Sequence, residues 1–230
     1  MVNSRLDTGD IMHRSRGSQI QLRSPDPRRF DARAVIGEGS RAPRVYLVGE
    51  APGREEAESG RPFVGPAGTA LREMMREAGM NEAQIRLANA LPFRPIKRST
   101  TRGLRNRKPT NKELRAYGPI VLADIACVRP KLIIALGTSA ASLFGISTTI
   151  DRARKQVFWL NGIPVRVTYH PGYVLRFGGR GSKLWRTAVR DLRNYSKPER
   201  GSSSPSSSPA AMKGARVAEC ICRWPRPVRS

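Results

Sequence analysis

The sequence has 230 residues, enough for one folded domain with flanking segments, and 39% of them are hydrophobic. Lys and Arg outnumber Asp and Glu by 42 to 18, and the formal net charge of +24 exceeds what solubility requires. This excess indicates a polyanionic partner, with a generally basic proteome as the alternative. No apolar run is long enough to span a membrane, and the N-terminus lacks the residue order of a secretory signal. We therefore expect a cytoplasmic protein without membrane contact.

Composition divides the chain into three segments. Residues 1–40 mix Arg, Ser, Gly, Asp and Pro without periodicity, which predicts a basic and largely flexible arm. Residues 41–196 carry the regular hydrophobic patterns of a folded domain. Residues 197–230 are rich in Ser and Pro, which predicts a disordered basic tail. The three cysteines of the chain are too few for a disulfide framework.

Strands and helices alternate along the folded domain. The hydrophobic patterns predict strands at about 44–49, 85–90, 131–137 and 165–169, and helices at about 67–78, 110–127 and 182–194. A short helix follows Thr138, and the Asn161-Gly162 pair marks a hairpin. This order predicts an α/β fold with a mostly parallel sheet that helices cover on both faces.

The loop after the first strand has the composition of an active site. It carries three glutamates, Glu50, Glu55 and Glu56, together with Phe63, beside the carboxyl end of a buried strand. Ligands of open α/β sheets bind next to such ends. We therefore expect Glu50 and Phe63 to lie close to Asn89 and His170, which end two other strands.

A strongly basic segment follows the second strand. Residues 94–108 hold seven positive side chains and no negative one. We expect a long loop that cannot pack inward and that lies along phosphates near the proposed site.

Several of these segments together are similar to one enzyme family. They are Gly49-Glu50-Ala51-Pro52-Gly53, the Gly60-Arg61-Pro62-Phe63-Val64-Gly65-Pro66-Ala67-Gly68 stretch, Asn89, Asn106-Arg107-Lys108-Pro109-Thr110, Arg129-Pro130-Lys131 and Tyr169-His170-Pro171-Gly172-Tyr173. In this order they resemble the uracil-DNA glycosylase superfamily, most of all its family 4, over about residues 40–195. The resemblance implies a three-layer α/β/α sandwich with a four-stranded parallel sheet, and it makes residues 41–196 the catalytic domain.

The resemblance also implies an activity and a set of site residues. The activity is that of a monofunctional DNA glycosylase of bacterial base excision repair, which flips deoxyuridine out of DNA and hydrolyses its N-glycosidic bond. Free uracil and an abasic site are the products, and we expect a monomer. The implied catalytic residues are Glu50, Asn89 and His170, and the uracil pocket would comprise Gly49, Ala51, Gly53, Glu56, Phe63, Asn89 and His170. The DNA contacts would come from Arg94, Lys97, Arg98, Arg102, Arg105, Arg107, Arg176 and Arg180, with Leu175 as the duplex-invading residue.

The chemistry of uracil suits these residue types. Uracil presents an N3–H donor beside the O4 acceptor, and the amide of Asn89 complements both, whereas cytosine would leave two buried mismatches of roughly 1–3 kcal/mol each. Thymine shares this edge, so a wall must exclude its methyl group, and either Glu56 or the Gly53 backbone supplies it. His170 would donate a hydrogen bond to uracil O2 as the leaving base becomes negative. Glu50, favoured over Glu55, would position water or stabilise the cationic sugar.

The sequence departs from the family in two places. Family 4 enzymes hold an iron–sulfur cluster on four cysteines, whereas here the first 126 residues contain none, and Phe93 and Tyr117 stand at about the places of the second pair. We therefore expect no cluster and no other metal. A related branch traps the sugar on a histidine of the basic loop, and this loop has no histidine, so we expect turnover.

Two other functions remain open. The first is a DNA-binding module that has kept the fold and lost catalysis, and the second is a glycosylase that accepts other deaminated bases. A binding module would hold uracil-containing DNA without leaving an alkali-labile site, and a panel of damaged bases would identify the broader enzyme.

Overall fold

The computed structural model describes residues 12–14, 20–22, 26–101 and 103–197. Its centre is a six-stranded sheet in the order β10-β11-β9-β5-β6-β4. The strands are β4 (Glu38–Gly39), β5 (Val45–Gly49), β6 (Ile85–Asn89), β9 (Leu132–Leu136), β10 (Phe158–Leu160) and β11 (Ile163–Thr168). The four inner strands are parallel, and β10 and β4 are antiparallel to their neighbours. The predicted parallel sheet is confirmed, with an antiparallel strand added at each edge.

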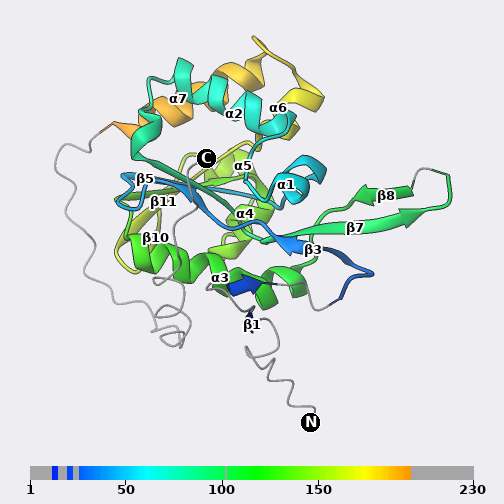
Figure 1. The fold of residues 1–230 in the computed structure, drawn as a ribbon. Coiled ribbons are helices and arrows are strands. Elements are labelled where there is room, and N and C mark those ends of the chain that lie inside the picture. The colour runs from blue at the N-terminus through cyan, green and yellow to red at the C-terminus, as the bar shows by residue number, and fades with distance from the viewer. Residues whose placement is uncertain (1–11, 15–19, 23–25, 102, 198–230) are drawn as a thin grey trace.

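Helices cover both faces of this sheet (Figure 1). One layer contains α2 (Pro66–Glu77), α6 (Pro171–Phe177) and α7 (Lys183–Ser196), and the other contains α3 (Asn111–Val128) with α4 (Thr138–Leu143) and α5 (Ile150–Ala153). Two smaller helices, α1 (Arg54–Ser59) and the 3-10 helix η2 (Glu82–Gln84), lie in the connections. The three-layer α/β/α sandwich predicted from the sequence is therefore the observed architecture.

The alternation of strand residues builds two separate cores. Tyr46 and Val48 of β5 pack with α3, while Val45 and Leu47 pack with α2 and α7. All four side chains are buried, as a strand covered on both faces requires. The strand's unbroken apolar run thus reflects two cores rather than one.

Helix ends agree with the sequence signals. The side chain of Thr110 accepts the Glu113 N–H at the start of α3, and Glu113 accepts the Thr110 N–H, which completes a capping box. Asn161 and Gly162 both have positive φ, 49° and 81°, in the two-residue turn between β10 and β11. Local side-chain chemistry thus fixes these boundaries.

The basic segment after β6 differs from the predicted loop. It forms β7 (Phe93–Ser99) and β8 (Gly103–Asn106), an antiparallel hairpin that projects from the body, and β3 (Phe30–Ala34) pairs with β7. The positive charges of the segment favour an exposed loop, because charge does not reveal strand pairing. The hairpin base is buried and its outer part is exposed.

The boundary expected at residue 41 also differs. Residues 26–40 belong to the fold, because Phe30 and Val35 are buried and β4 joins the central sheet. Short strands of two to five residues give no readable periodicity. Of the remaining arm, β1 (Met12–Arg14) pairs with β2 (Ile20–Leu22). The expected tail lies outside the described residues except for Lys197. No helix in the described part is long and apolar enough to cross a membrane.

Candidate active site at the carboxyl ends of the strands

Four parallel strands deliver polar residues to one edge of the sheet. Glu50 follows β5, and Asn89 ends β6. Ser139 lies three residues after the end of β9, and His170 follows β11. Because parallel strands end at the same edge, residues from four distant segments come together. This is the edge that the sequence predicted for Glu50, Phe63, Asn89 and His170.

Asn89 and Phe63 meet at Gly49. A Cβ at position 49 would lie 2.5 Å from Asn89 Oδ1 and 2.5 Å from Phe63 Cζ, so only glycine fits there. Asn89 is 4% exposed, and none of the hydrogen bonds among the described residues uses its side-chain amide. Phe63 is equally buried and has a φ of 57°, which is rare for a non-glycine residue. Because the Asn89 amide is not among the buried polar atoms that lack a partner, it still reaches solvent beside the Phe63 ring and is available to a flat polar ligand.

His170 is oriented by the start of α6. It is the N-cap residue of this helix, and its Nδ1 accepts the backbone N–H of Gly172 at 3.1 Å. Nε2 therefore carries the proton of the neutral imidazole and is its donor. Burial lowers the pKa of His170, and the negative charge of Glu50 acts in the opposite direction. The side chain is thus a neutral hydrogen-bond donor at physiological pH.

Glu50 is held by a residue that the sequence did not single out for the site. Ser139 Oγ donates to Glu50 Oε2 at 2.5 Å. The sequence marks Thr138-Ser139 only as the start of a short helix, although a hydroxyl just after a strand's carboxyl end was the available signal. Ser139 is 3% exposed, so its bond to the carboxylate is shielded from water. Glu50 consequently has one fixed orientation next to His170.

Glu56 has a structural part in the loop. One of its oxygens accepts the Gly53 N–H at 2.9 Å, and the other accepts the Gly65 N–H at 2.8 Å. It is 8% exposed, and its carboxylate ties the loop after β5 to the start of α2. Ala51, also expected in the pocket, packs against the core on the α3 side of the sheet. Glu56 and Ala51 therefore lie beside the site, away from the point where Asn89 and Phe63 meet.

The predicted DNA contacts divide into buried and exposed groups. Arg94 is 6% exposed and binds Asn106 and Asp31, and Arg107 pairs with Glu113. Arg107 and the Thr110 amide outweigh burial and lower the pKa of Glu113 to about 2. These two arginines therefore stabilise the hairpin base.

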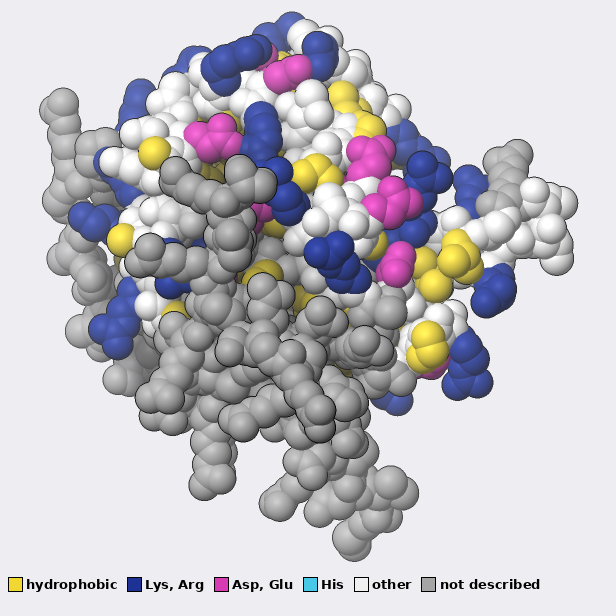
Figure 2. Space-filling view, viewed as in Figure 1, with side chains coloured by type: hydrophobic (Ala, Val, Ile, Leu, Met, Phe, Trp, Pro, Cys, Tyr) yellow, Lys and Arg dark blue, Asp and Glu magenta, His cyan; other side chains and the backbone are white. Residues whose placement is uncertain are grey.

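The other basic residues face solvent. Lys97, Arg98 and Arg105 are exposed on the hairpin, and Arg176 is exposed on α6. Arg180 is exposed and pairs with Glu73. Figure 2 shows Lys and Arg side chains over this face and on the projecting hairpin, with a smaller group of Asp and Glu between hairpin and body. Arg102 lies outside the described residues.

Leu175 lies between the core and a surface hollow of about 400 Å³, which it lines together with Val64 and Pro66. It is half-buried and packs against the core formed by α2 and α7. The exposed large hydrophobic residues of α6 are instead Tyr173 and Phe177.

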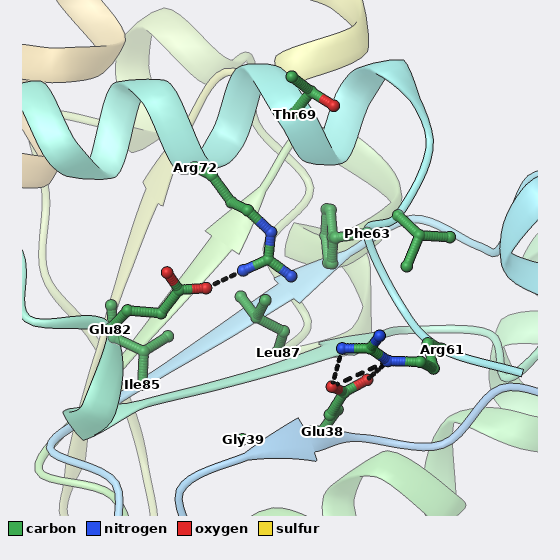
Figure 3. Close-up of a pocket in the computed structure, with 10 residues that line it drawn as sticks. Glu38, Gly39, Arg61, Phe63, Thr69, Arg72, Glu82, Ile85 and Leu87 are labelled. Atoms are coloured by element: carbon green, nitrogen blue, oxygen red, sulfur yellow. Dashed lines mark hydrogen bonds and ion pairs between the residues drawn. The ribbon is translucent and has the colours of Figure 1, made fainter. Parts of the chain in front are cut away.

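A pocket of about 500 Å³ lies next to Phe63 and away from the strand ends. Figure 3 shows it between α2 and the strands β4 and β6, with Ile85 and Leu87 at its floor. Two ion pairs, Arg61 with Glu38 and Arg72 with Glu82, lie across it. Each arginine of this pocket already pairs with a glutamate, and neither Asn89 nor His170 lines the pocket. We therefore place the chemistry at the strand ends.

Three aromatic rings fill the region where the family resemblance would place a metal cluster. Phe93 and Tyr117 stand at the places of two cluster cysteines, and their ring centroids are 5.4 Å apart with an interplanar angle of 77°. Phe30 contacts both, at 6.1 and 5.5 Å. All three are buried, and the Arg107 guanidinium lies 5.6 Å from the centre of the Phe30 ring. Aromatic rings offer no thiolate to iron, so these residues do not fit an iron–sulfur cluster.

Known proteins share this architecture. The uracil-DNA glycosylase superfamily model matches residues 36–193. A type-4 uracil-DNA glycosylase of Thermotoga maritima is 39% identical over 161 residues, which cover 69% of this chain and 79% of that protein. Enzymes of the same name are 34% identical in Archaeoglobus fulgidus and 32% in Pyrobaculum aerophilum, with 68% and 64% of this chain and 79% and 76% of theirs covered. The matched residues span the sheet, both helical layers and all four strand ends, and the chain belongs to the uracil-DNA glycosylase superfamily.

Proposed function

We propose that this protein is a monofunctional uracil-DNA glycosylase that extrudes deoxyuridine from DNA and hydrolyses its N-glycosidic bond. The observation that carries the proposal is the largely buried Asn89, whose side-chain amide makes no hydrogen bond among the described residues and meets Phe63 at Gly49. The amide therefore stays available to a ligand, and the N3–H and O4 of uracil would pair with it. Cytosine presents the opposite pattern and would be rejected.

His170 would stabilise the leaving base. The Nε2–H of a neutral imidazole donates to uracil O2, where negative charge develops as the bond breaks, and it does so without giving up its proton. The Gly172 N–H keeps Nδ1 occupied, so the ring is oriented before the substrate arrives. Glu50, held by Ser139, would orient water or stabilise the cationic sugar. Because the hairpin segment has no histidine, the sugar would be released and the enzyme would turn over.

We further propose that the enzyme acts without an iron–sulfur cluster and as a monomer in the bacterial cytoplasm, with DNA as substrate and free uracil as product. The packing of Phe30, Phe93 and Tyr117 supports the first point, because rings replace the ligands at the hairpin base. The exposed basic residues of the hairpin and α6 support a DNA substrate.

The test uses an oligonucleotide with one uracil, incubated with the protein, treated with alkali and separated on a denaturing gel. Strands with thymine or cytosine at the same position serve as substrate controls. We expect cleavage of the uracil strand alone, and its loss or a shift toward cytosine in Asn89→Asp.

Asn161→Asp is the matched control, because it makes the same chemical change in the exposed turn between β10 and β11. It should cleave as the unchanged protein does. An uncut uracil strand that still shifts on a native gel would show a DNA-binding module instead. Cleavage of strands with hypoxanthine or xanthine would show a broader glycosylase.

A further inference from the structure

Three aromatic side chains form a column that begins next to His170. They are Tyr169, which precedes the N-cap residue of α6, and Tyr173 and Phe177 within the helix. The spacing of four residues places them on the same side. The ring centroids of Tyr169 and Tyr173 are 6.1 Å apart at an interplanar angle of 12°, and those of Tyr173 and Phe177 are 4.7 Å apart at 41°. The rings therefore form one continuous aromatic surface.

The two outer rings of the column are not part of the core, whereas Tyr169 at its inner end packs against the core formed by α2 and α7. Tyr173 is 47% exposed and Phe177 is 60% exposed, whereas Val174 on the inner side of the same helix is fully buried. Phe177 has the largest exposed fraction among the large hydrophobic residues described. The column thus keeps costly aromatic surface in water beside the proposed active site, as ligand-binding patches do.

The charges around the column favour a nucleic acid strand. The guanidinium of Arg176 lies 5.3 Å from the centre of the Phe177 ring, and Arg176 forms no ion pair with any described carboxylate. At the other end the guanidinium of Arg154 lies 5.9 Å from the Tyr169 ring, whose hydroxyl donates to Asp151. A row of rings with a cation at its exposed end combines the two features by which proteins hold single strands, base stacking and phosphate contact.

We propose that Tyr169, Tyr173 and Phe177 form a base-stacking platform for the nucleobase adjacent to the extruded nucleotide. Extrusion removes one stacking neighbour from that base, and the outer Phe177 ring replaces it while Arg176 turns to the phosphate. Leu175 packs against the core formed by α2 and α7 and is not one of these rings. The position of the platform next to the uracil rests on the proposed function, but its binding to a DNA strand does not.

The first test measures binding of the full chain to a fluorescent thymidine oligonucleotide that contains no uracil. Phe177→Ala should weaken binding about fivefold to 150-fold, the range expected when a base–aromatic stack is truncated. Phe177→Leu should weaken it too, because it keeps apolar surface without a flat ring, and Tyr173→Phe should bind as the unchanged protein does. Trp159→Ala, which removes a 38% exposed ring from the edge strand β10, is the matched control and should have no effect. Equal affinities for Phe177→Ala and Trp159→Ala would overturn the proposal.

The second test places 2-aminopurine next to uracil. Extrusion of the uracil unstacks the probe and raises its fluorescence, so the rise should be smaller with the unchanged protein, whose Phe177 ring stacks on the probe, than with Phe177→Ala. Uracil excision with the same fluorescence rise in both proteins would refute the platform and keep the glycosylase. Binding of uracil-free strands that depends on Phe177, with no excision, would refute the glycosylase and keep the platform.

Discussion

The protonation state of His170 depends on a backbone hydrogen bond and on burial. The Gly172 N–H occupies Nδ1, and burial lowers the pKa of the ring below its usual value of 6.5. A lowered pKa means that the neutral form persists at pH values where a free imidazole would be charged. If the neutral ring is the active form, the enzyme should lose activity only below pH 6.5, where the ring becomes protonated.

We predict that His170→Ala lowers kcat by about 10²–10³-fold, the typical loss for one donor to a developing negative charge. The expected cause is the missing hydrogen bond to the leaving base. Single-turnover rates on the uracil oligonucleotide between pH 4.5 and 8 would measure it, and the unchanged protein should lose activity only below pH 6.5. An acid limit above pH 6.5 in the unchanged protein would contradict a neutral donor.

Ser139 should act through Glu50. Removing its hydroxyl in Ser139→Ala should lower kcat roughly tenfold with little change in KM, because a hydrogen bond to a charged group contributes about 1.5–3 kcal/mol and part of it serves orientation. Ser139→Thr keeps the hydroxyl and should restore the rate. Steady-state kinetics of both variants would measure this, and equal losses in both would mean that Ser139 only packs.

The same site shows what residue types and spacing can predict. Glu50, Asn89 and His170 could be assigned to one edge because each follows an apolar run, and parallel strands end together. The Ser139 bond and the double hydrogen bond of Glu56 could not be assigned, because they depend on side-chain directions that the spacing does not determine. Residue type and spacing placed these side chains at one edge of the sheet, and the hydrogen bonds between them required the structure.

At the scale of elements, the basic hairpin is anchored by aromatic packing. Phe93 is fully buried between Phe30 and Tyr117, and β3 continues the sheet beside β7. The sequence suggested a loop because seven charges stood in fifteen residues, and net charge does not reveal strand pairing. The first four residues of β7, Phe93 to Ile96, are all buried, and they include Arg94, which pairs with Asp31. A basic residue suggests an exposed position, and its partner on a distant segment cannot be identified from the sequence.

We predict that Phe93→Ala lowers the free energy of unfolding by about 3–5 kcal/mol, the usual cost of removing a buried ring. Tyr117→Phe should be nearly neutral, since it keeps the ring and the structure gives the hydroxyl no hydrogen bond among the described residues. Chemical denaturation followed by circular dichroism would measure the stability of both variants. The same measurement on unchanged protein from iron-depleted and iron-supplemented cultures would test whether iron stabilises the fold. A stability that depends on iron supply would contradict the aromatic replacement of the cluster.

At the scale of the whole molecule, net charge sets the response to salt. Each phosphate that a variant no longer neutralises should reduce the slope of log affinity against log salt by about 0.7–0.9. Arg94 and Arg107 are paired internally and should contribute little, whereas Lys97 and Arg105 face each other across the hairpin in solvent. The number of basic residues therefore overestimates the number of phosphates that the protein binds.

We predict that the double variant Lys97→Ala and Arg105→Ala lowers this slope by about 1.4–1.8, twice the value for one phosphate. Lys131→Ala, which removes an exposed charge just before the amino end of β9, should leave the slope unchanged. Fluorescence anisotropy across a salt titration would measure both. Equal slopes for all three proteins would show that the hairpin does not touch DNA.

The hairpin also has a free edge. In the three-stranded sheet β3-β7-β8, the outer side of β8 pairs with no other described strand, and all four of its residues are exposed. An open strand edge can pair with the same edge of another copy, which leads to aggregation, and charged side chains are a common protection. Arg105 and the facing Lys97 thus repel a second hairpin as well as attract phosphate. Concentrated solutions should stay clear at low salt, and removal of these two charges should make the protein prone to self-association.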